Sequence, residues 1–95
     1  MAATAKSLTG SDQAVAAAHT RLYGWSVRNT HATDAGSVAI YNDPDSANGT
    51  ILGVISLAAG ASSTVWFGPQ GVTADLGVYV DIPATGTWSG TIYTG

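Results

Sequence analysis

The feature that most restricts the fold of this chain is a succession of short apolar runs, separated by turn-forming clusters about ten residues apart. In the run RLYGWSVRN, Tyr23, Trp25 and Val27 alternate with Leu22, Gly24 and other residues of the opposite face. A period of two is typical of a strand with one buried face. We therefore expect an all-β protein, either an antiparallel β-sandwich of jelly-roll-like form or a small barrel, with an N-terminal arm.

Further runs extend this pattern to the end of the chain. They cover residues 37–43, 50–58, 64–67, 77–82 and 87–93. The run TILGVISLA at 50–58 is nearly continuous in branched apolar residues, which is typical of a strand covered on both faces. The intervening segments Asp43–Gly49, Gly68–Gly71 and Pro83–Gly86 are rich in Gly, Pro, Asn and Asp, and we expect turns or loops there.

The chain length predicts one domain. At 95 residues without cysteine, its core is modest and no disulfide can reinforce it. Association with copies of itself or with a partner is then the common route to stability. Residues 1–18 are rich in Ala, Thr and Ser and have little to bury, so we expect an arm or an edge strand there. Residues 19–95 are expected to form a single β-sandwich domain.

Charge excludes several classes of partner. Only 9% of residues are charged, against about 25% in ordinary domains, and the net charge of −3 opposes phosphate binding. No apolar run approaches the roughly 20 residues that span a bilayer, and residues 1–13 do not resemble a signal peptide. We therefore expect neither a nucleic-acid nor a membrane partner, and synthesis in the cytoplasm. The low charge suits a surface that lies against neighbouring chains.

The two histidines are the only candidates for histidine-based catalysis. A hydrolase would need His19 or His31 beside a carboxylate, such as that of Asp34, and beside a hydroxyl. The chain contains no GxSxG motif, and both histidines are sufficiently explained as residues flanking strands and turns. We therefore expect no catalytic residues and no enzymatic activity.

The acidic loop that begins at Asp43 faintly resembles a calcium loop. An EF-hand starting there needs glycine at its sixth position and glutamate at its twelfth, but these positions hold Asn48 and Val54. Phosphate-binding glycine motifs are also absent from the sequence. We expect neither a metal site nor a cofactor.

Large aromatic side chains are numerous for so small a chain. Those in or beside the expected strands are Tyr23, Trp25, Trp66, Phe67, Tyr79, Trp88 and Tyr93. Rings at alternating strand positions usually fill a core or an oligomer interface, and we expect that role. The alternative is a platform that stacks sugar rings, for which the candidates are Trp25, Trp66, Trp88, Tyr23, Tyr41, Tyr79 and Tyr93. Its signature would be two or three coplanar, exposed rings among the three tryptophans.

Three phrases of the sequence resemble small structural proteins of tailed bacteriophages. They are RLYGWSV at 21–27, TVWFGPQG at 64–71 and GVYVDI at 77–82, and the resemblance extends over residues 20–95. It implies a β-sandwich or jelly-roll-like protein without enzymatic activity, held on the virion by many identical contacts. Capsid decoration or cement proteins of this kind often form trimers over threefold positions of the shell.

From this resemblance we expect a capsid decoration protein on the virion surface, whose partners are its own copies in a homotrimer and the major capsid protein. A tail or fibre component is a variant of that hypothesis. The alternative is a carbohydrate-binding or host-adhesion module, free-standing or displayed on a virion, with surface glycans as its partner.

Overall fold

The computed structural model describes residues 4–9, 12–82 and 88–95. Within them the chain forms nine strands: β1 (Thr4–Ser7), β2 (Gln13–Ala16), β3 (Thr20–Asn29), β4 (Gly36–Asn42), β5 (Thr50–Leu57), β6 (Ser62–Trp66), β7 (Val72–Ala74), β8 (Val78–Asp81) and β9 (Trp88–Thr94). The turn expected at Pro83–Gly86 lies outside the described residues.

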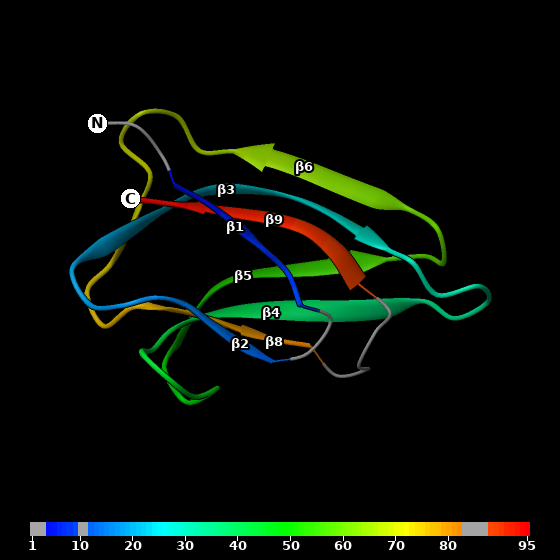
Figure 1. The fold of residues 1–95 in the computed structure, drawn as a ribbon, viewed down its shortest axis with the longest axis horizontal. Helices are drawn as coiled ribbons and strands as arrows, with labels where there is room; N and C mark the ends of the chain where they lie inside the picture. Colours follow the sequence, from blue (N-terminus) through cyan, green and yellow to red (C-terminus); the bar gives the residue numbers. More distant parts are fainter. Residues whose placement is uncertain (1–3, 10–11, 83–87) are drawn as a thin grey trace.

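The strands form two antiparallel sheets that pack face to face, as the two layers of Figure 1 show. The sheet that we call sheet A has the order β1-β9-β3-β6, and β7 pairs with the other end of β3 beside β6. Sheet B has the order β2-β8-β4-β5. The all-β antiparallel sandwich expected from the alternating runs is confirmed.

The strand pairing is nested along the chain. The first strand pairs with the last, β2 pairs with β8, β3 pairs with β6, and β4 pairs with β5. This is the pairing of one long hairpin, with its tip between β4 and β5, that has been rolled into two layers. When the three-residue β7 is set aside, the strand order is that of an eight-stranded jelly roll.

The core lies between the two sheets. Its largest fully buried apolar side chains are Leu22, Val38, Ile40, Val78, Val80 and Ile92. Trp25 reaches from β3 toward Gly53 of β5, where an added Cβ would lie 3.1 Å from the Trp25 ring. Gly53 therefore leaves the space that this ring occupies between the layers.

A β-bulge interrupts the alternation expected in β3. The register against β9 shifts between Leu22 and Gly24, so that Leu22, Trp25 and Val27 all belong to the core. Tyr23 is buried outside this core cluster and stacks on Trp66, with ring centroids 5.7 Å apart. The prediction that Tyr23 shares a face with Trp25 and Val27 was wrong, because the extra residue of the bulge shifts the phase of the strand.

The segment 1–18 contributes edge strands where the structure describes it. Thr4–Ser7 pairs with β9 at one edge of sheet A, and Gln13–Ala16 pairs with β8 at one edge of sheet B. Val15 is part of the core. These strands belong to the sandwich itself, so the described part of this segment is not a detached arm.

The prediction that the run 50–58 is covered on both faces was wrong. It forms β5, which is an edge strand of sheet B, and its side chains at Ile51 and Val54 are 53% and 56% exposed. The physical reason is that the chain has only two layers, so each sheet has one face without a covering layer. An apolar outer face of sheet B results.

Candidate functional site

The outer face of sheet B carries a row of apolar and aromatic side chains across all its strands. Tyr41 of β4 lies opposite Tyr79 of β8 and Ile51 of β5, and Ala14 of β2 lies opposite Tyr79. We call this surface the tyrosine face and define it by Ala14, Ala39, Tyr41, Ile51, Val54 and Tyr79. The strand order leaves this apolar surface without a covering layer among the described residues.

The sequence of each strand explains why these side chains point outward. In β4 the inward positions Val38 and Ile40 are fully buried, so the alternate positions Ala39 and Tyr41 face away from the core. In β5 the register shifts beside Tyr41. Because of this shift, Ile51 and Val54 are both exposed while the intervening Leu52 packs against the core.

Two carboxylates lie at the β8 and β2 side of the tyrosine face. Asp81 is opposite Ala39, and Asp12 precedes β2 and accepts a hydrogen bond from the Ile82 backbone N–H at 2.8 Å. Burial, followed by the charge of Asp12 and a hydrogen bond with it, raises the pKa of Asp81. Burial and the same two carboxylates also raise the pKa of the Tyr79 phenol. Negative charge therefore accumulates here, and no basic side chain of the described residues forms an ion pair with it.

Replacing Asp81 with asparagine is expected to stabilise the isolated domain at pH 7 by a few tenths of a kcal/mol, because solvent screening keeps the effect small. The folded state raises the pKa of Asp81, so the stability that its protonated form contributes is lost as pH rises through that folded pKa. Urea unfolding of both proteins from pH 3 to pH 8 checks this. The difference should vanish below the ordinary aspartate pKa of about 4. A difference that is constant with pH would contradict the electrostatic explanation.

The outer face of sheet A has a different chemistry. Rows of residues with small hydroxyl side chains cross this face. We call these rows the hydroxyl face and define it by Ser7, Ser26, Ser62, Thr64, Ser89 and Thr91, together with Arg28. Ser26 lies opposite Thr64 and Thr91, and Arg28 lies opposite Ser62 and Ser89. The Ser26 and Thr64 hydroxyl oxygens are 3.3 Å apart. These rows are polar, and Arg28 is the only charged residue described on them. The next row of the same outer face carries Tyr93 and the exposed Trp66.

The aromatic residues singled out in the sequence separate into buried and exposed groups. Trp25 and Trp88 are in the core, whereas Trp66 is 58% exposed. Tyr23 stacks on Trp66, and Phe67 contacts the Trp25 ring edge-on at 5.5 Å. Tyr79 and Tyr93 are half-buried on opposite outer faces. A sugar platform of Trp25, Trp66 and Trp88 is therefore wrong, since two of the three rings are inside the protein.

Tyr41 was named among the rings that could stack on sugars, but not among the aromatic residues predicted for a core or an interface. Its signal was its position in the run SVAIYND, where it alternates with the apolar pair Val38 and Ile40. That alternation places an aromatic ring on the side of the strand away from the core. Without the strand order, however, nothing in the sequence brings Tyr41 opposite Tyr79.

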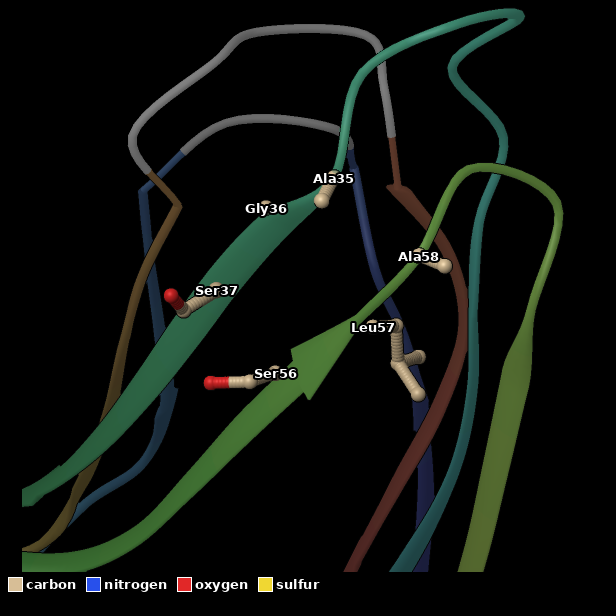
Figure 2. Close-up of a pocket in the computed structure, with 6 residues that line it drawn as sticks. All are labelled: Ala35, Gly36, Ser37, Ser56, Leu57 and Ala58. Atoms are coloured by element: carbon tan, nitrogen blue, oxygen red, sulfur yellow. The ribbon is translucent and has the colours of Figure 1, made fainter.

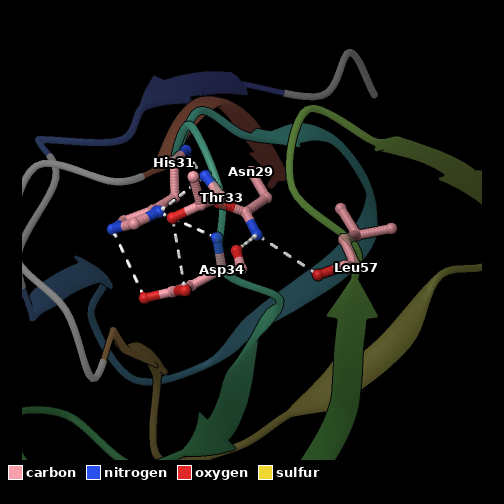
Figure 3. Close-up of polar contacts among 5 residues, drawn as sticks. All are labelled: Asn29, His31, Thr33, Asp34 and Leu57. Carbon is pink, nitrogen blue, oxygen red and sulfur yellow. Dashed lines mark hydrogen bonds and ion pairs between the residues drawn. The ribbon is translucent and has the colours of Figure 1, made fainter.

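His31 is held within the loop between β3 and β4 (Figure 3). Its Nδ1 accepts hydrogen bonds from the backbone N–H groups of Thr33 and Asp34, at 3.2 and 3.0 Å, and its Nε2 lies 3.7 Å from Asp34 Oδ2. Both ring nitrogens thus face groups of their own loop. The Thr33 hydroxyl of that loop donates to Asp34 Oδ1 and not to His31, so the loop contains no nucleophile–base pair. His19 is exposed and has a φ of 61° at the entry to β3.

The acidic loop is likewise explained by its own turn. Asp43 Oδ1 accepts hydrogen bonds from the backbone N–H groups of Asp45 and Ser46 and from the Ser46 hydroxyl. The hydrogen bond from Asp45 lowers the pKa of Asp43 most. Within the part of the chain that the structure describes, no group of three His, Cys, Asp or Glu residues could hold a metal ion.

Hollows among the described residues lie away from the tyrosine face. Figure 2 shows one of about 420 Å³ at the ends of β4 and β5, lined by Ala35, Gly36, Ser37, Ser56, Leu57 and Ala58. Its lining carries no charge, and its two hydroxyls come from the cross-strand pair Ser37 and Ser56. Another, of about 470 Å³, lies between the start of β3 and the end of β7, where Arg21 and Asp75 line it.

Comparisons with protein-family models, with curated proteins and with solved structures find no match to this chain. No helix in the described residues has the length and apolar character needed to cross a membrane.

Proposed function

We propose that this protein is a non-enzymatic structural component of a bacteriophage virion, and specifically a decoration protein that binds the assembled capsid and stabilises it. The observation that supports this best is the tyrosine face. It presents Ile51, Val54 and two tyrosines on a sheet surface that no other part of the described chain covers. Tyr and apolar residues with few charges are characteristic of the centre of protein interfaces.

The fold is compatible with this proposal but does not select it. Jelly rolls build viral capsid domains, and they also build lectins and cupins. The resemblance of the phrases around Trp25, Trp66 and Tyr79 to phage structural proteins favours the capsid among these uses. The low content of charged side chains, 9% of the chain, also suits a protein that is repeated densely beside its own copies.

Such a protein stabilises a shell by linkage. It binds the assembled lattice and not its dissociated subunits, so each bound copy lowers the free energy of the assembled state alone. Neither a catalytic group nor a cofactor is required. The requirement is an apolar, shape-complementary surface that is repeated in identical copies, and the tyrosine face is the described surface that fits it.

The test is to add the purified protein to capsids that were assembled without it and to image them by cryo-electron microscopy. Ordered density at symmetric positions, together with a higher shell disruption temperature, is the expected result. Ile51→Ser should reduce occupancy at least about tenfold, since it removes a large apolar side chain from the interface.

Leu76→Ser is the matched control, because Leu76 is as exposed as Ile51, at 53%, but lies in the turn between β7 and β8 outside the tyrosine face. Its occupancy should equal that of the wild-type protein. Bare shells at saturating protein would overturn the capsid proposal.

A glycan-binding module is the second candidate, and one observation favours it. Tyr41 and Tyr79 lie directly opposite each other on the solvent face, with the Asp81 carboxylate on the neighbouring row. Aromatic faces stack on sugar rings and carboxylates accept hydrogen bonds from their hydroxyls. Calorimetric titration with bacterial surface polysaccharides would identify this function if binding is lost in Tyr79→Ala and kept in Trp66→Ala.

A further inference from the structure

The charged residues of this chain are divided between the two sheets. All three Lys and Arg residues, Lys6, Arg21 and Arg28, lie in strands of sheet A, which contain no described acid. The strands of sheet B contain a single charged residue, Asp81. Within the described ranges, the one ion pair is between His31 and Asp34. Lys6 lies opposite the buried Ile92 and so belongs to an inward row of sheet A. Arg28 on the hydroxyl face and Asp81 beside the tyrosine face are outward charges of opposite sign, and neither forms an ion pair among the described residues.

We propose that the tyrosine face is occupied by a second copy of this chain, which docks with its hydroxyl face so that Arg28 of one copy pairs with Asp81 of the other. This inference names the partner of the surface on which the proposed function also rests. The contact is heterologous, because each copy contributes a different face to it.

The spacing of the rows supports this docking. On the tyrosine face, Asp81 belongs to the row next to that of Tyr41 and Tyr79. On the hydroxyl face, Arg28 belongs to the row next to that of Ser26. Successive outward rows of any sheet are about 7 Å apart. When Arg28 meets Asp81, the tyrosine row can therefore lie over the row of Ser26, Thr64 and Thr91.

The chemistry of these rows is also compatible. The side chains under the tyrosine rings would be small, so the two faces could approach closely, and their hydroxyls could exchange hydrogen bonds with the phenol groups. Tyrosine packed on small hydroxyl residues loses little conformational entropy on binding, since its ring has only two side-chain torsions. The charge pair then sets the register of the contact.

Arg28 is suitably placed to reach a partner. Its Nε donates to the Gly60 carbonyl at 3.3 Å, which holds the base of the guanidinium, and its terminal nitrogens have no partner among the described residues. Asp81 and Asp12 repel each other in the single chain. A guanidinium that arrives from a second copy would relieve that repulsion and could bind a carboxylate with two hydrogen bonds.

A heterologous contact closes into a ring when the rotation between copies permits, and otherwise forms an open filament. The tyrosine face and the hydroxyl face lie on opposite sides of the two-layer sandwich, so docking one on the other stacks copies along one axis and predicts an open assembly and not a closed ring. The terminal copy of such a stack keeps a free tyrosine face for the capsid. Each interface contains one Arg28 and one Asp81, so a single substitution affects all interfaces equally.

The test is a charge exchange that is followed by size-exclusion chromatography with light scattering. The wild-type protein should be oligomeric, and Asp81→Arg and Arg28→Asp should each weaken association at least about tenfold, because each places like charges in contact. The double variant Asp81→Arg/Arg28→Asp should recover association, since the pair is restored with its polarity reversed. The matched control is the double variant Asp81→Arg/Lys6→Asp, which keeps Arg28. It should not recover association.

Three results would overturn the inference: a monomeric wild-type protein at millimolar concentration, single variants that associate as well as the wild type, or a folded double variant that stays monomeric. Circular dichroism of each variant establishes that it is folded. A monomer that still decorates capsids would refute this contact and leave the proposed function intact. If the charge exchange restores association but the protein leaves the capsids bare, the contact between copies stands and the proposed function is refuted.

Discussion

Replacing Gly90 with alanine is expected to destabilise the domain by at least about 3 kcal/mol. Gly90 lies in β9 with a φ of +130°, and a Cβ there would lie 2.1 Å from the Ser26 carbonyl oxygen and 2.7 Å from the Val27 Cα. Those atoms belong to the backbone of the central strand β3, so no side-chain rotation can relieve the clash. The β3–β9 pair holds the middle of sheet A together, and separating it would disturb the whole layer.

Gly60→Ala is the matched control for this experiment. Gly60 has a φ of +75°, but nothing lies within 4 Å of the position that its Cβ would take. It therefore measures the cost of the backbone conformation alone, about 1–2 kcal/mol. Thermal unfolding should show the difference clearly, since 1 kcal/mol corresponds to about 4–8 °C in a domain of this size. Equal losses of stability in the two variants would show that the close approach of β9 to β3 does not matter.

Much of the fold could be predicted because the periodicity reports directly on burial. The runs that became β4, β8 and β9 alternate apolar and other residues, and their inward positions, such as Val38 and Val80, are fully buried. The bulge at Tyr23 could not be predicted, since it depends on how β3 pairs with a strand more than sixty positions later in the chain. The strand β7 has only three residues, too few to show a period.

The candidate site was much less predictable than the fold. The apolar character of Ile51 and Val54 was evident, but a covered strand and an uncovered edge strand have the same composition. Which one occurs depends on the number of layers in the fold. The division of charge between the sheets is equally invisible in the sequence, where Arg28 and Asp81 are two charged residues far apart. Only the nested pairing assigns them to opposite outer faces.

Asp81 has opposite effects on the stability of the single domain and on the association that we infer. Burial, and after it the neighbouring Asp12, raises the pKa of Asp81 and so disfavours its ionised carboxylate in the isolated domain. A chain selected for stability alone would place an uncharged residue at this position. The carboxylate is useful when a cation arrives from outside, and Asp81→Asn should therefore stabilise the single domain while it weakens the association that we infer.

Replacing Asn29 with alanine is expected to destabilise the domain by about 2–4 kcal/mol, which is the cost of leaving several buried polar groups without partners. Asn29 is 1% exposed and joins three backbone segments, as Figure 3 shows. Its Nδ2 donates to the carbonyls of Asp34 and Leu57 at 3.0 and 3.2 Å, and its Oδ1 accepts from the His31 N–H at 3.0 Å. The side chain thus links β3 of sheet A to the end of β5 in sheet B.

Two further variants separate the causes of this loss in urea unfolding experiments. Asn29→Asp keeps an acceptor for the His31 N–H but removes both donors, so it should also be strongly destabilised at pH 7, where a buried charge would face two carbonyl oxygens. Asn48→Ala removes an exposed amide that donates to the Ser46 hydroxyl at 3.2 Å, and it should change stability by less than about 0.5 kcal/mol. If Asn29→Ala were as stable as Asn48→Ala, the polar link between the layers would contribute nothing, and apolar packing around Trp25 and Trp88 would have to hold this end of the sandwich closed.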